Sequence, residues 1–197
     1  MNPRIASAEQ LLAACGWEIE HARNVRDLAL ALFDQLQPIH QLGAAERDIL
    51  EAAALLHDIG WTVAEKKHHK HSADLIRRNA SRLAGFSPTE IECIALVARY
   101  HRKSEPSLQH EEFAALAESE RNMVGKLAAL LRLADGLDRP HWQAVRGVAC
   151  EITDREVRIR VCTRGEPSPS IEGALRKRGL FETVFSLRVE FGVLAGD

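Results

Sequence analysis

The stretch E-A-A-A-L-L-H-D-I-G at residues 51–60 decides the fold, because an apolar helix ends there in a histidine and an aspartate. The spacing of the apolar residues predicts a helix from about 44 to 59, and Gly60 is its expected stop. His57 and Asp58 continue the apolar stripe of this helix, which faces the core of a helical protein. We therefore expect both polar side chains to point into the interior.

Three other helices carry a polar residue on an apolar stripe in the same way. Helical spacing predicts them over residues 8–36, over 87–101 behind the cap S-P-T-E, and along a segment from about 123 to 137. Shorter helices are expected near 70–83 and 108–118. The polar residues on the three stripes are His21, His101 and Asp135.

The pattern of apolar residues changes after Pro140. From there apolar residues alternate with others, which is typical of strands. The expected elements are a hairpin of 148–152 and 157–161 around a turn at 153–156, a helix near 171–182, and a third strand over 187–191. The sequence thus predicts a mainly α fold, with a helical domain at 1–140 and a small α+β appendage at 141–197 packed on it.

Length and charge limit the classes of function. The 197 residues fit one domain with a small appendage, and 26 lysines and arginines against 28 aspartates and glutamates leave a net charge of −2. Such a chain has no overall field that attracts nucleic acid or a membrane, so we expect neither partner. None of the four cysteines is in a C-x-x-C pair, and neither a leader peptide nor a membrane span is predicted, which favours a cytoplasmic protein.

The candidate site is formed by His21, His57, Asp58 and Asp135. A buried carboxylate without a partner is costly, so two of them need a compensating cation. Together with neutral imidazoles they make a mixed nitrogen and oxygen set that suits Mn, Fe, Zn or Mg. A single histidine on an apolar face is more often a hydrogen-bonded core residue, and that interpretation stays open for each one. Four helices with such positions favour a metal site, because facing helices of a bundle assemble metal sites between them.

A second cluster of polar residues is basic. It consists of K-K-H-H-K-H at 66–71 and R-Y-H-R-K at 99–103. One interpretation is a solvated basic loop, and the other is a phosphate-binding rim beside the metal. In the second case, His71 or His68 joins His101 in holding a second metal.

The pattern H…HD…D, at His21, His57-Asp58 and Asp135, resembles the HD superfamily of metal-dependent phosphohydrolases. Four longer segments make the resemblance more specific: A-L-L-H-D-I-G, H-H-K-H-S, A-L-V-A-R-Y-H-R-K and L-R-L-A-D-G-L-D-R-P-H. They resemble the C-terminal HD-like region of the exopolyphosphatase and guanosine pentaphosphate phosphatase family, over about residues 21–191. That family's polyphosphate-hydrolysing N-terminal actin-like domains have no counterpart in these residues. The likeness implies an HD-domain helical bundle.

The resemblance also implies a function, that of a metal-dependent phosphohydrolase acting on a nucleotide or another small phosphorylated substrate. Asp58, or Glu65 as a second candidate, would orient or deprotonate the attacking water. The first divalent metal would be held by His21, His57, Asp58 and Asp135, and a second one with the help of His71 and His101. The substrate phosphates would be bound by Lys70, Arg99, Arg102 and Arg139.

A second function stays open on the same residues. The chain would then be a non-catalytic or regulatory module that binds polyphosphate or another phosphate ligand, related to the C-terminal domain of exopolyphosphatases. The resemblance is also compatible with a homodimer.

Overall fold

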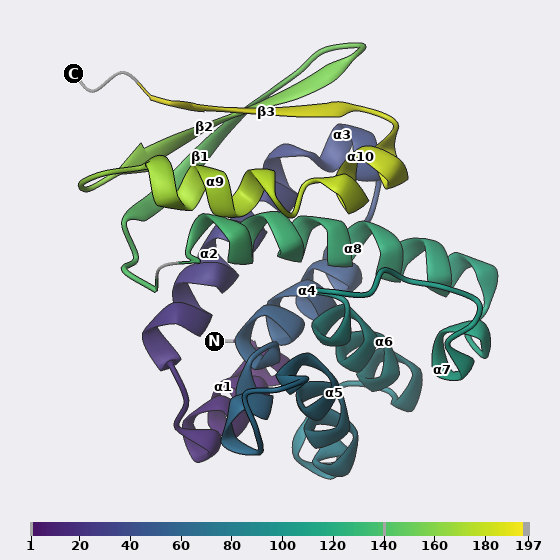
Figure 1. Ribbon diagram of the computed structural model, residues 1–197. Helices are drawn as coiled ribbons and strands as arrows, with labels where there is room; N and C mark the ends of the chain where they lie inside the picture. Colours follow the sequence, from purple (N-terminus) through teal and green to yellow (C-terminus); the bar gives the residue numbers. More distant parts are fainter. Residues whose placement is uncertain (1, 140, 195–197) are drawn as a thin grey trace.

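The computed structural model describes residues 2–139 and 141–194 and shows a mainly helical body with a small sheet at its C-terminal side (Figure 1). The elements of the body, in chain order, are α1 (Pro3–Cys15), α2 (Ile19–Gln35), α3 (Gln37–His40), α4 (Ala44–Leu56), α5 (His68–Arg78), α6 (Pro88–Arg99), α7 (Glu111–Ala114) and α8 (Glu118–Leu137), with 3-10 turns at Ile59–Thr62 and Ala80–Arg82. They are followed by β1 (Val145–Ile152), β2 (Glu156–Thr163), α9 (Ser168–Leu175), α10 (Gly179–Phe185) and β3 (Arg188–Val193). The predicted fold class is confirmed.

The core lies around α4 and α8. All residues of α4 from Ala52 to Leu56 are fully buried, and α4 packs against α1, α2 and α6. Every residue of α8 from Leu127 to Leu137 is buried. In Figure 1, α8 lies between the helical body and the C-terminal elements, with α9 and α10 between α8 and the sheet. Polar residues near the ends of α4 and α8 therefore lie inside the molecule.

Several predicted helix limits are wrong, for local reasons. The helix predicted over 8–36 is two helices, because Gly16 takes the left-handed conformation, with φ of 67°, and ends α1. The segment predicted at 108–118 keeps only the short α7. The helix predicted near 171–182 is broken at 176–178, between α9 and α10. By contrast, the cap at Ser87 is confirmed, since its hydroxyl accepts from the backbone N–H of Glu90.

The sheet has the strand order β1-β2-β3. The predicted hairpin is confirmed, with Val148 opposite Val161 in an antiparallel pair. The third strand runs parallel to β2, with Val189 opposite Val157. A parallel neighbour needs a crossover connection, and α9 and α10 form it. This crossover brings the segment between the two helices back to α8.

Two glycines permit close approaches that shape the site. A Cβ atom at Gly173 would lie 2.3 Å from the carbonyl oxygen of Gly136, so α9 crosses α8 directly beside Asp135. A Cβ atom at Gly60 would lie 2.1 Å from the carbonyl oxygen of His68. The start of α5 is therefore held against the chain that follows α4.

In the part of the chain that the structure describes, no helix combines the length and the apolar character needed to cross a membrane.

Candidate metal centre

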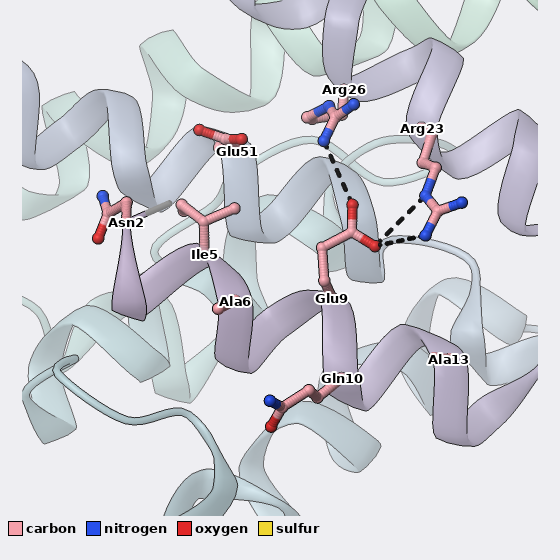
Figure 2. A pocket seen from close by; sticks show the side chains of 9 residues that line it. All are labelled: Asn2, Ile5, Ala6, Glu9, Gln10, Ala13, Arg23, Arg26 and Glu51. Carbon is pink, nitrogen blue, oxygen red and sulfur yellow. Dashed lines mark hydrogen bonds and ion pairs between the residues drawn. The ribbon is translucent and has the colours of Figure 1, made fainter.

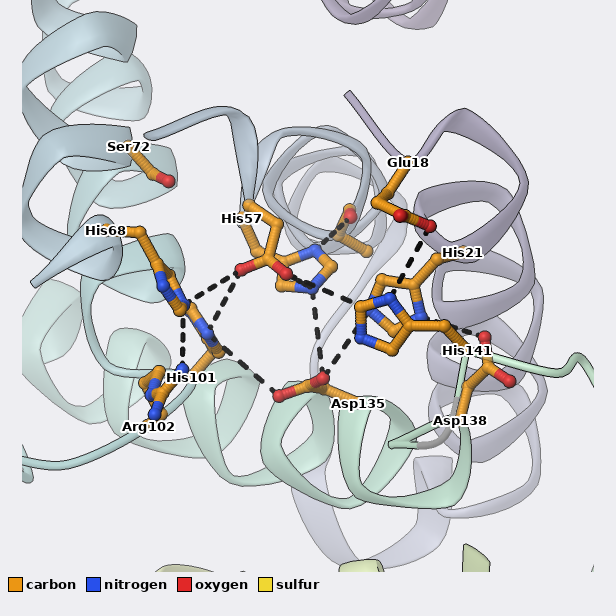
Figure 3. Close-up of polar contacts among 12 residues, drawn as sticks. Glu18, His21, His57, His68, Ser72, His101, Arg102, Asp135, Asp138 and His141 are labelled. Carbon is orange, nitrogen blue, oxygen red and sulfur yellow. Dashed lines mark hydrogen bonds and ion pairs between the residues drawn. The ribbon is translucent and has the colours of Figure 1, made fainter. Parts of the chain in front are cut away.

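Six polar side chains from five segments meet in the core, next to the C-terminal end of α4 (Figure 3). All six are buried, and the rings of His21 and His57 are 0% exposed. They are His21 from α2, His57 and Asp58 after α4, His68 from α5, His101 after α6, and Asp135 from α8. The four residues that the sequence predicts as one site, His21, His57, Asp58 and Asp135, lie together.

Each of the four imidazoles is oriented by a hydrogen bond from its Nδ1 atom. Carbonyl and carboxylate oxygens only accept, so Nδ1 donates and Nε2 points into the cluster. Histidines that bind metals are held in this way. The acceptors are the carbonyl of Ala54 for His57 at 2.8 Å, that of Ala98 for His101 at 2.7 Å, that of Glu65 for His68 at 3.0 Å, and the Asp138 carboxylate for His21 at 2.8 Å.

The two carboxylates divide the cluster into two half-sites, because each points one oxygen to either side. In the first half-site, Asp58 Oδ2 and Asp135 Oδ1 face His21 Nε2 at 3.9 and 3.7 Å and His57 Nε2 at 3.6 and 3.9 Å. In the second half-site, Asp58 Oδ1 faces His68 Nε2 at 3.3 Å and His101 Nε2 at 3.4 Å, while Asp135 Oδ2 lies 4.0 Å from His101 Nε2.

The 3.3 and 3.4 Å separations of the second half-site match neighbouring ligands of one cation, and the 3.6–3.9 Å separations of the first half-site lie between the neighbouring and the opposite positions. Metal–ligand bonds of about 2.1 Å in tetrahedral or octahedral geometry put neighbouring ligand atoms roughly 3.0–3.4 Å apart and opposite ones about 4.2 Å apart. The Nε2 atoms of His21 and His57 and the Oδ1 atom of Asp58 are buried, and within residues 2–139 and 141–194 they have no hydrogen-bond partner. Four other buried atoms of the described residues also lack a partner, but these three converge on one cluster with two carboxylates, where a divalent cation would satisfy them.

Burial and charge set the protonation states of the cluster. Burial lowers the pKa values of His68 and His101, so both are neutral at pH 7 and free to act as ligands. Burial also opposes protonation of His21, but the carboxylates of Asp135 and Asp138 outweigh it and raise the pKa to about 9. Burial would raise the pKa of Asp135, yet Lys177 and His21 hold it well below its usual range. A cation entering the first half-site would therefore displace a proton from His21.

A cavity of about 380 Å³ opens over the second half-site. Its lining includes the cluster residues Asp58, His68, His101 and Asp135, together with Trp61 and His141. The positively charged side chains that line it are Arg102, Lys103, Arg139, Arg176 and Lys177. Five cations against two carboxylates make this cavity suited to a phosphate group.

The structure does not bring four of the predicted residues into the cluster or the cavity. His68, and not His71, joins the cluster, because α5 begins at His68 and the ring of His71 is part-exposed. Glu65 is exposed and meets the cluster only through its carbonyl. Lys70 is exposed and does not line the cavity. Arg99 pairs with Glu112 at 3.1 Å, also away from the cavity. By contrast, the cavity is lined by Arg102 and Arg139, both of which the sequence places at the phosphates.

The sequence analysis did not identify three residues that contact the cluster: Asp138, His141 and Lys177. Asp138, the C-cap of α8, lies three positions after Asp135, and this spacing could have identified it. His141 stacks on the ring of His21, with 3.7 Å between the centroids. Lys177 forms an ion pair with Asp135, which lies far away in the sequence, and no motif or residue spacing near Lys177 predicts this contact.

A second cavity, of about 550 Å³, lies beside α1 (Figure 2). Three of its four charged residues, Glu9, Arg23 and Arg26, are paired with one another, and the fourth, Glu51, pairs with Arg47 outside the cavity. Glu9 accepts hydrogen bonds from Arg23 at 3.0 Å and from Arg26 at 3.2 Å. No metal-ligand group found within the described residues lies there. The buried cluster is therefore the better candidate site.

Comparisons with known proteins agree on one family. Residues 4–166 match the family model of Ppx/GppA phosphatase, domain III. Two relatives are guanosine-5'-triphosphate,3'-diphosphate pyrophosphatases, from Aeromonas salmonicida (strain A449) at 32% identity and from Aeromonas hydrophila subsp. hydrophila at 33% identity, each over 134 residues. The matched part is 68% of this chain and 26% of either relative. The chain thus corresponds to about a quarter of the length of these curated relatives.

Proposed function

This chain belongs to the family of Ppx/GppA phosphatase domain III, and from that membership and the buried cluster we propose that it is a metal-dependent phosphohydrolase acting on a nucleotide or another small phosphorylated compound. The observation that carries the proposal is the set of orphaned ligand atoms in the core, on His21, His57 and Asp58, below a cavity lined with cations. Buried ligands and a phosphate-attracting opening are the two parts that metal-assisted phosphoryl hydrolysis requires.

The first half-site would hold the cation. Two imidazole nitrogens and two carboxylate oxygens form its ligand set, a mixture that Mn, Fe, Mg and Zn all accept. When bound, such a cation polarises a phosphoryl oxygen and makes a water more acidic. The pattern of His21, His57-Asp58 and Asp135 on separate helices is also the reason why we place the chain in the HD superfamily.

The protein's own residues would position the reactants. Asp58 reaches both half-sites with its two oxygens and lines the cavity, so it is the residue best placed to orient the attacking water and accept its proton. Arg102 and Arg139 line the same cavity and would bind phosphate oxygens through their planar guanidinium groups. Asp138 would act through His21, by fixing the direction of the ring.

The relatives favour a phosphoanhydride as the substrate class. Their printed name describes a pyrophosphatase of a guanosine nucleotide with phosphates at two positions. We therefore propose that the cavity of this chain accepts a nucleotide or a similar compound that carries more than one phosphate. A divalent cation and the cavity's five basic side chains would bind such a polyanion more strongly than a phosphomonoester.

A second candidate is a non-catalytic module that binds polyphosphate or another phosphate ligand. The short match favours it, because this chain covers only 26% of either relative, so the relatives' activity need not reside in this part. The same cationic cavity would serve such a module. Binding without turnover distinguishes the two candidates.

The test uses the purified full chain, stripped with EDTA and then titrated with Mn²⁺. Phosphate release is measured from a nucleoside triphosphate, inorganic polyphosphate and p-nitrophenyl phosphate. We expect wild type to bind Mn²⁺ and to hydrolyse at least one of these, and Asp58→Asn to lose turnover and bind Mn²⁺ poorly. Asp154→Asn, at an exposed turn, is the matched control. Hydrolysis by Asp58→Asn at the wild-type rate would contradict the proposal, while phosphate binding without turnover would favour the module.

A further inference from the structure

The two half-sites differ in what already touches their ligand atoms. In the first, the Nε2 atoms of His21 and His57 have no hydrogen-bond partner in the described part of the chain. In the second, two outer ligands are already engaged by side-chain cations. The ammonium of Lys177 donates to Asp135 Oδ2, and Arg102 Nη1 lies 3.0 Å from His68 Nε2. The first half-site is thus free for a cation. In the second, side-chain cations contact Asp135 and His68, and Asp58 Oδ1 has no hydrogen-bond partner within the described residues.

The fold holds Lys177 in this place. It lies in the break between α9 and α10, and α9 crosses α8 where Gly136 and Gly173 allow the backbones to touch. The side chain of Lys177 is only 16% exposed, and that of Asp135 only 9%. The contact is therefore a partly buried ion pair delivered by the crossover, and it lies outside residues 4–166, which match the family. Arg102 follows His101 directly and reaches His68 from the other side.

We propose that Lys177 and Arg102 take the place of a second divalent cation, so that the protein binds one divalent ion in the first half-site and a phosphoryl group between that ion and these two side chains. The inference rests on the proposed metal-dependent function and names its phosphate subsite. In this arrangement, the side chains of the second half-site bind a phosphate oxygen of the substrate and not a second metal ion.

Charge and donor geometry both support this assignment. A divalent ion in the second half-site would lie a few ångströms from the Lys177 ammonium, and like charges at that distance in a partly buried site repel strongly. A phosphoryl group carries the opposite charge. Lysine has three N–H donors and arginine five, so each side chain can keep its present partner, Asp135 or His68, and still donate to a phosphate oxygen.

The experiment measures two quantities by calorimetry on the EDTA-stripped full chain: the number of Mn²⁺ ions bound, and the affinity of the Mn²⁺-loaded protein for inorganic phosphate. We compare wild type with Lys177→Met and with Lys177→Arg, which keeps the charge. Lys70→Met is the matched control, since Lys70 is an exposed lysine away from the cavity. Circular dichroism melting checks that each variant is folded.

We expect one Mn²⁺ per wild-type chain. Lys177→Met should bind phosphate about tenfold more weakly or worse, because a charged hydrogen bond is lost, and should accept a second Mn²⁺. Lys70→Met should stay within about twofold of wild type, because an exposed charge contributes little. Lys177→Arg should keep more of the phosphate affinity than Lys177→Met, because it keeps the charge. Two Mn²⁺ ions in wild type, or unchanged phosphate affinity in Lys177→Met, would overturn the inference and leave the metal-dependent function standing. A wild type that binds no divalent ion would instead overturn the proposed function, and this inference with it.

Discussion

Replacing Asp138 with asparagine tests whether the orientation of His21 controls cation binding. Asp138 is 1% exposed, and its two oxygens have different partners. Oδ2 accepts from His21 Nδ1 at 2.8 Å, and Oδ1 accepts from the backbone N–H of Gln143 at 2.8 Å. Both partners are donors, so the site calls for two acceptors. Asparagine provides one oxygen and one NH₂ group, and one contact must fail.

The size of the effect follows from which contact fails. If the NH₂ group faces His21, Nδ1 must become an acceptor, and the ring proton moves to Nε2, where it blocks the first half-site. If the NH₂ group faces Gln143, a buried N–H loses its acceptor and the loop after α8 shifts. Loss of such an orienting partner typically weakens metal binding by about 10–100-fold, which corresponds to about 1.4–2.7 kcal/mol.

The assay is Mn²⁺ calorimetry at pH 7.5 on stripped wild type, Asp138→Asn and the control Asp154→Asn, whose carboxylate is exposed. We expect the control to bind like wild type and Asp138→Asn to bind at least about tenfold more weakly while remaining folded. An affinity of Asp138→Asn within about twofold of wild type would show that the ring direction of His21 does not matter, and the assignment of His21 as a ligand would fail.

Three further predictions concern packing and pH. In Gly60→Ala the new Cβ would meet the His68 carbonyl at 2.1 Å, so we expect a loss of about 1–3 kcal/mol in urea unfolding; unchanged stability would contradict the close approach. In Gly173→Ala the contact with Gly136 at 2.3 Å forces α9, and Lys177 with it, away from Asp135, so phosphate should bind more weakly and a second Mn²⁺ should enter as in Lys177→Met; equal phosphate affinity would argue against it. In metal-free protein the pKa of His21 is raised to about 9 from 6.5, so its contribution, up to about 3 kcal/mol, is complete below pH 6.5 and is lost as pH rises through 9. Urea unfolding with EDTA at pH 6 and pH 9.5 should show this loss in wild type but not in His21→Gln.

The parts of the site that could be predicted lie on helices with a clear apolar stripe. His21, His57 and Asp135 share their stripes with buried aliphatic residues, so helical periodicity fixes their direction without tertiary information. The sequence does not give the distances between these side chains in space. The interior of a helical bundle is small, however, so side chains that point inward from several helices come close to one another. The hairpin was predictable for the same reason, because alternation is a local property.

The remaining parts depend on where elements begin and on contacts that are distant in sequence. His68 and His71 lie three positions apart, so both fall on one face of α5, and only the start of the helix decides which is nearer the cluster. Lys177 reaches Asp135 over 42 positions, because a glycine crossing and a helix break place it there. The parallel pairing of β3 with β2 likewise follows from the crossover. The alternation of apolar and polar residues in β3 predicts a strand but not the direction in which it pairs.

The charges of the cavity connect these findings to the kind of substrate. Its lining has five cationic side chains and two carboxylates, so it is already positive before a divalent ion binds. One such ion would neutralise the charge of Asp58 and Asp135; Arg176 is paired with Glu172 at 3.2 Å, which leaves Arg102, Lys103, Arg139 and Lys177 to the ligand. A single phosphate dianion cannot balance them, and a second divalent ion would enlarge the excess. A ligand with several phosphates would balance the cavity, which is why the phosphoanhydride assay, more than the monoester assay, is the sharper test of this site.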